Sequence, residues 1–364
     1  MEMIRAVDFG HASIAPLRGI LQGGSTRAGL FPAGHLSQGK VYMGSMHKLL
    51  MQGVTATVAV TLALPAMPQE PAGQGPVIKS QVNLVNLFAT VRDRNKRIVP
   101  TLKQEDFRVS EDNQEQKIAF FSREVALPIT LALLLDTSGS EQDMLPSIQD
   151  AGSQFIGRII RKGDEALVMS FDSNVDLLSD FTDERGQLER AIRKSRINIP
   201  DQGSMGGNPG PIGSRQITGT ALYDAIYLAC GEKLATEAGR KAIVIVTDAQ
   251  DEGSKVKLEE AIEAAQRTDT VIHILLVVDP RYGGNPGVAH KIAEETGGRM
   301  ISVRGEKKLL EAFDEISQEL RSQYTLGYYP TNSAQDGKFR KVKVETAEKD
   351  LKVLTRKGYY APKG

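Results

Sequence analysis

The sequence predicts an α/β fold in which a doubly wound, mainly parallel sheet is inserted into a small β-sandwich. Two short apolar runs, 131–135 and 243–246, lead into acidic residues at Asp136 and Asp248. Unbroken apolar runs of this length are typical of strands buried on both faces, as in a parallel sheet under helices. Both ends of the chain instead alternate with period two, which indicates antiparallel strands.

Strands and helices alternate between residues 126 and 322, which is the pattern of a mainly parallel sheet with helices on both faces. Beyond Ser140 the apolar residues recur with a period near 3.6, and Pro146 fits the first turn of a helix. Further strands are expected at 167–171, 271–278 and 300–303, with an edge strand at 175–181. Further helices are expected at 184–194, 256–267, 288–296 and 307–321.

The flanking segments 81–125 and 323–364 each predict about three short strands. Val85, Leu87 and Ala89 share one face of a period-two segment, and Leu326 and Tyr328 do so at the other end. Neither flank has enough apolar residues for a core of its own. We therefore expect the two flanks to pair as the halves of one β-sandwich.

The amino-terminal region divides into three parts. Residues 1–45 show no sustained period, and we interpret them as unstructured or as an artefact of the assigned start site. Residues 46–66 have a basic start, an apolar stretch shorter than the ~20 residues of a spanning helix, and a small residue before a polar segment. This is the pattern of a secretory signal peptide, with an uncleaved membrane anchor as the alternative. Residues 67–80 are expected to be a linker.

These features predict a secreted, periplasmic or cell-envelope protein without a stable membrane span once the signal is removed. The 364 residues carry a formal net charge of zero, and no basic tract suggests a nucleic-acid partner. The five histidines lack metal-ligand spacing, which argues against a zinc site. The single cysteine, Cys230, is expected to be a small core or half-buried residue and not a nucleophile. His273, within an apolar run, is expected to be a core residue with its ring hydrogen-bonded.

Asp136, Ser138 and Ser140 lie in the loop after the first buried strand, where open α/β sheets bind ligands. One carboxylate and two hydroxyls suit a hard cation such as Mg²⁺, although the same residues often cap a helix. Two later segments favour the metal: the turn 218–225 enters another helix, and the run 243–251 is again a strand that ends on an acid.

These three segments, in this order and at these separations, resemble the von Willebrand factor type A (VWA) domain and its metal-ion-dependent adhesion site. The resemblance implies that Asp136, Ser138, Ser140, Thr220 and Asp248 surround one divalent cation, either Mg²⁺, Mn²⁺ or Ca²⁺. It also implies that an acidic side chain of a protein partner completes the coordination shell. In the flanks, segments 106–112, 326–330, 336–340 and 356–360 resemble those of a bacterial group of VWA-related proteins.

Two residues of the loop after Asp248 bear on the site. The family more often has glycine where this chain has Ala249, a departure that removes no ligand. Asp251 is a nearby acid that we interpret as a solvated loop residue.

The Gly-, Pro- and Ser-rich segment 198–217 precedes Thr220, and we expect it to shape the approach to the cation.

The favoured function is a binding module and not an enzyme, because no residue is positioned as a nucleophile or general base. One rival hypothesis is a Mg²⁺-dependent phosphotransferase or phosphatase that uses Asp136 as nucleophile. Against it, Ser138 stands where such hydrolases usually carry a second aspartate. Another rival is a structural envelope protein in which the metal only stabilises the fold.

Overall fold

The computed structural model describes residues 84–364, apart from 125–126, 198–218, 279–280 and 282. The predictions for residues 1–45, the signal peptide at 46–66, the linker at 67–80 and the loop at 198–217 therefore lie outside the described residues. In the part of the chain that is described, no helix combines the length and the apolar character needed to cross a membrane.

The centre of the fold is a six-stranded sheet in the order β10-β9-β8-β5-β6-β7. Its neighbouring strands are parallel, except that β7 runs antiparallel to β6 at the edge. The strands are β5 (Ile129–Asp136), β6 (Glu165–Phe171), β7 (Val175–Thr182), β8 (Arg240–Thr247), β9 (Thr270–Val277) and β10 (Met300–Val303). The predicted mainly parallel sheet and its edge strand are confirmed.

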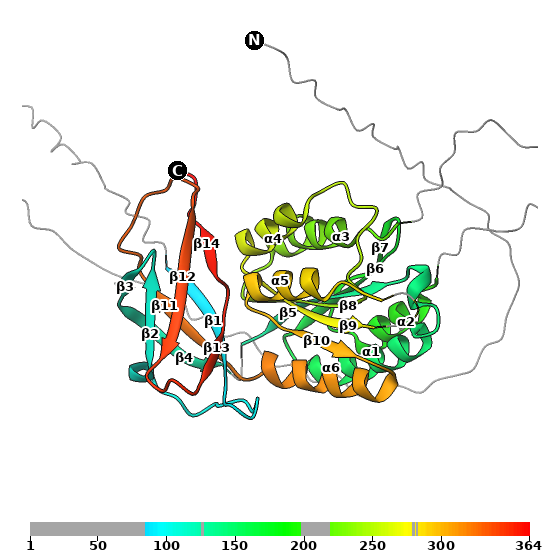
Figure 1. Ribbon diagram of the computed structural model, residues 1–364, viewed down its shortest axis with the longest axis horizontal. Coiled ribbons are helices and arrows are strands. Elements are labelled where there is room, and N and C mark those ends of the chain that lie inside the picture. The colour runs from blue at the N-terminus through cyan, green and yellow to red at the C-terminus, as the bar shows by residue number, and fades with distance from the viewer. Residues whose placement is uncertain (1–83, 125–126, 198–218, 279–280, 282) are drawn as a thin grey trace, which may run out of the picture. The chain divides into compact units, whose positions relative to one another are not determined.

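Helices cover both faces of this sheet, as Figure 1 shows. They are α1 (Leu145–Ile159), α2 (Arg185–Lys194), α3 (Leu222–Leu228, continued by a π-helical turn at Ala229–Lys233), α4 (Leu258–Arg267), α5 (Pro286–Thr296) and α6 (Glu306–Leu320). Alternate residues of β5 enter two cores: Leu133 packs with α1, α2 and α6, whereas Leu134 packs with α3, α4 and α5. This two-sided burial explains why β5 is apolar throughout.

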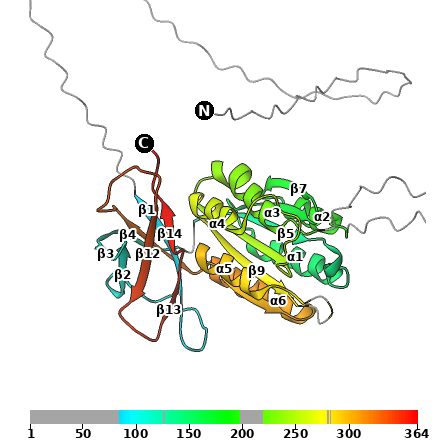
Figure 2. The same cartoon turned by 45° about the horizontal axis from the view of Figure 1, so that its top comes forward.

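The two flanks of the chain pair to form a β-sandwich, with sheets ordered β13-β1-β11-β4 and β14-β12-β2-β3. In Figure 2 the cyan strands of the first flank and the red-brown strands of the second lie together, although they are far apart in sequence. Apolar residues from both sheets, including Leu87, Val109 and Tyr359, form one core. The predicted insertion of the α/β fold between the halves of a sandwich is confirmed.

Among the described residues, each flank contributes four strands, where about three were expected. The strands are β1 (Val85–Arg92), β2 (Phe107–Glu111), β3 (Gln114–Gln116), β4 (Ile118–Glu124), β11 (Gln323–Tyr328), β12 (Phe339–Thr346), β13 (Lys352–Leu354) and β14 (Gly358–Tyr360). The additional strands, β3 and β14, have three residues each. A segment of that length cannot display a period, so only its pairing with a neighbour identifies it as a strand.

A buried cluster of charges joins the sandwich to the α/β fold. Glu319 of α6 is fully buried and pairs with Arg92 of β1, and its Oε1 lies 2.8 Å from the Nε of Arg299. His273 of β9 is 2% exposed, with its Nδ1 3.8 Å from the Oε2 of Glu319. Among the described residues, neither ring nitrogen of His273 has a hydrogen-bond partner. The prediction that His273 is a core residue is confirmed. Its ring, however, does not make the expected hydrogen bonds to any described residue.

Burial, reinforced by the charges of Arg299 and Arg92, lowers the pKa of His273 to about 3. The imidazole is therefore neutral, because burial and the nearby guanidinium charges both disfavour its protonated form. Cys230 behaves as expected of a core residue. Its thiol is fully buried, and this burial raises the pKa of the thiol to about 12.

Candidate metal centre

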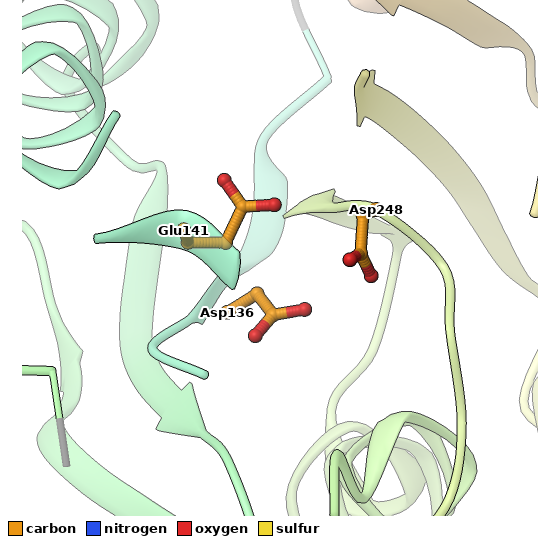
Figure 3. A group of neighbouring side chains, drawn as sticks. All are labelled: Asp136, Glu141 and Asp248. Carbon is orange, nitrogen blue, oxygen red and sulfur yellow. The ribbon is translucent and has the colours of Figure 1, made fainter. Parts of the chain in front are cut away.

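Neighbouring strands bring two of the predicted ligands together. Strands β5 and β8 are adjacent and parallel, with Leu135 opposite Val246, so their carboxyl ends meet at the same edge of the sheet. Asp136 is the last residue of β5, and Asp248 directly follows β8. Oxygen atoms from Asp136, Asp248 and Glu141 all lie within 4.8 Å of one another (Figure 3). This edge of the sheet thus carries three converging carboxylates, all of them buried.

Both carboxylate oxygens of Asp136 are held by hydrogen bonds. The backbone N–H of Ser138 donates to Oδ1 at 2.9 Å, and the hydroxyl of Thr247 donates to Oδ2 at 2.6 Å. The side chain is fully buried, and this burial raises its pKa to about 7 despite the hydrogen bonds. The negative charge of Asp248 acts in the same direction. A positive ion at this point would restore the preference for the ionised form.

Asp248 is oriented by the turn that follows it. Its Oδ1 accepts the backbone N–H of Gln250 at 3.0 Å, and its Oδ2 accepts the side-chain amide of the same residue at 3.1 Å. The intervening Ala249 has a φ of +59° and is fully buried. This left-handed conformation favours glycine, and Ala249 adopts it at a cost in strain.

The predicted hydroxyl ligands lie on two loops. The hydroxyls of Ser138 and Ser140 are 3.0 Å apart and half-buried at the end of β5. Thr220 is buried, and its backbone carbonyl accepts the N–H groups of Glu252 and Gly253, each at 3.1 Å. The loop of Thr220 is thereby tied to the loop after β8. The described contacts of Thr220 are made by its backbone, so its role as a ligand stays a prediction.

Close backbone packing explains a glycine in this loop. A Cβ on Gly219 would stand 3.0 Å from the carbonyl carbon of Glu252. Any larger residue would therefore push the loop of Thr220 away from the loop after β8.

Asp251, which we expected to be solvated, is half-buried and caps α3. It accepts hydrogen bonds from the N–H of Tyr223 at 3.1 Å and from the hydroxyl of Ser254. It is not one of the three converging carboxylates.

Sequence reasoning missed Glu141, the third carboxylate. Glu141 ends a 3₁₀ turn (Gly139–Glu141) and is 1% exposed. Helix α1 begins only at Leu145, so Glu141 lies before the apolar period that predicted the buried face of that helix. The available signal was its position directly after Ser140. A charged residue beside a candidate metal loop could have been included on that ground alone.

The donor set fits a hard divalent cation. Every candidate atom is a carboxylate or hydroxyl oxygen, and such ligands suit Mg²⁺, Ca²⁺ or Mn²⁺ more than softer metals. Among the described residues, neither Asp136 nor Asp248 forms an ion pair with a basic side chain. Buried carboxylates this close together repel one another, and a divalent cation between them would offset that repulsion.

A family model matches the central part of the chain. Residues 131–251 match the family model described as von Willebrand factor type A domain. This part of the chain is a von Willebrand factor type A (VWA) domain. The match begins in β5 and ends after Asp248, so it includes all the predicted ligands of the VWA domain. A comparison with curated protein sequences gave no match.

Several solved structures are similar to the chain at low identity. BatB from Bacteroides thetaiotaomicron is 19% identical with a TM-score of 0.40, over 53% of this chain and 100% of that one. A von Willebrand factor type A protein from Catenulispora acidiphila is 13% identical with a TM-score of 0.45, over 71% of this chain and 74% of that one. Proximal thread matrix protein 1 from the mussel byssus, in a form with a zinc-occupied MIDAS motif, is 16% identical with a TM-score of 0.44, over 58% of this chain and 49% of that one.

Proposed function

We propose that this chain is a secreted or cell-envelope binding module that holds a divalent cation and uses it to engage an acidic group of a protein partner. The proposed ligands are Asp136, Ser138, Ser140, Thr220 and Asp248. The observation that carries the proposal is the convergence of buried carboxylates at the carboxyl ends of β5 and β8. The extracellular location rests on the signal-like sequence at 46–66.

The arrangement at Asp136 supports binding over phosphoryl chemistry. A nucleophilic carboxylate needs an oxygen that can reach the substrate. Asp136 is fully buried, and its two oxygens already accept hydrogen bonds from Ser138 and Thr247. Both oxygens are therefore better suited to anchoring a cation, directly or through water, than to attacking a phosphorus atom.

The proposal is tested by titrating Mg²⁺, Mn²⁺ and Ca²⁺ into the purified full chain by calorimetry, beside Asp136→Ala. We expect one site per chain, lost in the variant because a central charge is removed. Asp143→Asn is the matched control, since its exposed carboxylate lies on the same loop and pairs with Arg281 at the surface. Equal cation affinity in the wild type and Asp136→Ala would refute the proposed site.

A further inference from the structure

Glu141 gives this metal centre a third carboxylate. Its side chain is 1% exposed, and one of its oxygens lies within 4.8 Å of oxygens from Asp136 and Asp248 (Figure 3). The 3₁₀ turn that ends at Glu141 also carries Ser140, and the backbone N–H of Glu141 donates to the carbonyl of Ser138 at 3.0 Å. The loop that supplies the hydroxyls therefore also holds Glu141 at the centre.

The charge of the centre depends on this residue. The carboxylates of Asp136 and Asp248 together neutralise one divalent cation. With Glu141 also ionised, the three carboxylates and the cation would sum to one negative charge, and a partner carboxylate would add a second. Like charges brought together in a buried site repel strongly, because the effective dielectric constant there is low. A cation held by Asp136 and Asp248 alone would form a neutral centre that admits an acidic partner, whereas the added negative charge of Glu141 would resist one.

The number of coordination positions leads to the same result. Mg²⁺ has few positions and a strict geometry, and protein sites usually leave several of them to water. A third carboxylate in the centre would take one position that water, and then a partner, would otherwise fill. Glu141 offers the same chemical group as the acidic side chain of the proposed partner, so the two would compete for the cation.

We propose that Glu141 is a built-in cap on the cation, occupying the coordination position that an acidic partner needs. The inference rests on the proposed metal site and specifies how that site is regulated. A partner carboxylate binds only when Glu141 is displaced. The partner must therefore supply further contacts on the rim of the site, because a lone carboxylate exchanges one like group for another and gains little.

The test uses Mn²⁺ as the metal, acetate as the acidic ligand, and the full chain as wild type and Glu141→Gln. Glutamine keeps the size of the side chain and removes its charge. Proton relaxation of the solvent reports the number of exchangeable waters on bound Mn²⁺. We expect one additional water in Glu141→Gln. We also expect at least about tenfold tighter acetate binding to the Mn²⁺ form, because the like charge is gone, and about tenfold weaker Mn²⁺ binding, because a charged ligand is lost.

Asp143→Asn is again the matched control and is expected to give wild-type values, since the Asp143 side chain is 62% exposed. An unchanged number of waters and unchanged acetate affinity in Glu141→Gln, with Mn²⁺ still bound, would overturn the capping role and leave the metal site intact. Failure of the wild type to bind Mn²⁺ would overturn both. If Glu141→Gln does not fold, Glu141→Asp keeps the charge on a shorter side chain and must show the same gain of water.

Discussion

Replacing His273 by leucine tests whether the buried imidazole at the junction is neutral. The ring is 2% exposed and lies between β9 and the Glu319 carboxylate, with Nδ1 3.8 Å from Oε2. A protonated histidine so close to a carboxylate would form an ion pair. Arg92 and Arg299 already pair with Glu319, however, so protonation would add a surplus positive charge in a buried place. We therefore expect the wild-type ring to resist protonation.

The magnitude follows from the pKa of His273, which falls from an ordinary value of 6.5 to about 3 in the folded chain. Below pH 6.5 the unfolded chain binds a proton that the folded chain does not. The free energy of unfolding therefore falls by about 1.4 kcal/mol per pH unit down to about pH 3. Between pH 6.5 and pH 5 this loss amounts to about 2 kcal/mol. Leucine removes this pH dependence. It also raises the free energy of unfolding by ~1–3 kcal/mol at pH 7, because no buried ring nitrogen is left without a hydrogen-bond partner.

The assay is urea unfolding of the wild type and His273→Leu at pH 7, 6 and 5, followed by circular dichroism. We expect the variant to be more stable at pH 7 and its advantage to grow by about 2 kcal/mol at pH 5. His290→Leu is the control, because that side chain is 63% exposed and lies on the surface of α5. A constant difference across this range would refute the neutral buried ring. A variant that gains least at pH 5 would indicate a protonated His273 paired with Glu319.

Three further substitutions test the junction and the loops of the metal centre. Glu319→Gln removes the buried counter-ion of Arg92 and Arg299 and leaves them only the half-exposed Glu315, so it should cost about 3 kcal/mol of unfolding free energy; a loss below about 1 kcal/mol in urea unfolding would contradict this. Gly219→Ala should weaken cation binding measured by calorimetry, because its Cβ would stand 3.0 Å from the backbone of the loop after β8; unchanged affinity would show that the two loops can separate freely. Ala249→Gly should leave stability within about 1 kcal/mol of wild type, because relief of about 1–2 kcal/mol of left-handed strain is offset by the lost methyl group and the greater freedom of the unfolded chain. A large change in the melting temperature in either direction would show that one of these two effects dominates.

Local patterns along the chain were enough to predict the α/β fold and the edge of the sheet where the candidate ligands lie. The apolar runs that end at Asp136 and Asp248 mark the ends of β5 and β8, because a strand buried on both faces must be apolar throughout and stops where polar residues begin. Alternation in the flanks similarly predicted a sandwich. These features depend on neighbours in sequence, so a single chain reveals them.

Other features of the site and the fold depend on contacts between segments that are distant in sequence. The turn at Gly139–Glu141 directs Glu141 toward Asp248, more than a hundred residues away, and no period in the sequence records that direction. Strands β3 and β14 have three residues each and are defined only by their partners. The environment of His273 depends on an arginine from β1 and a glutamate from α6. Charge, burial and strand pairing of this kind arise only when the chain has folded, because each requires two segments to meet in space.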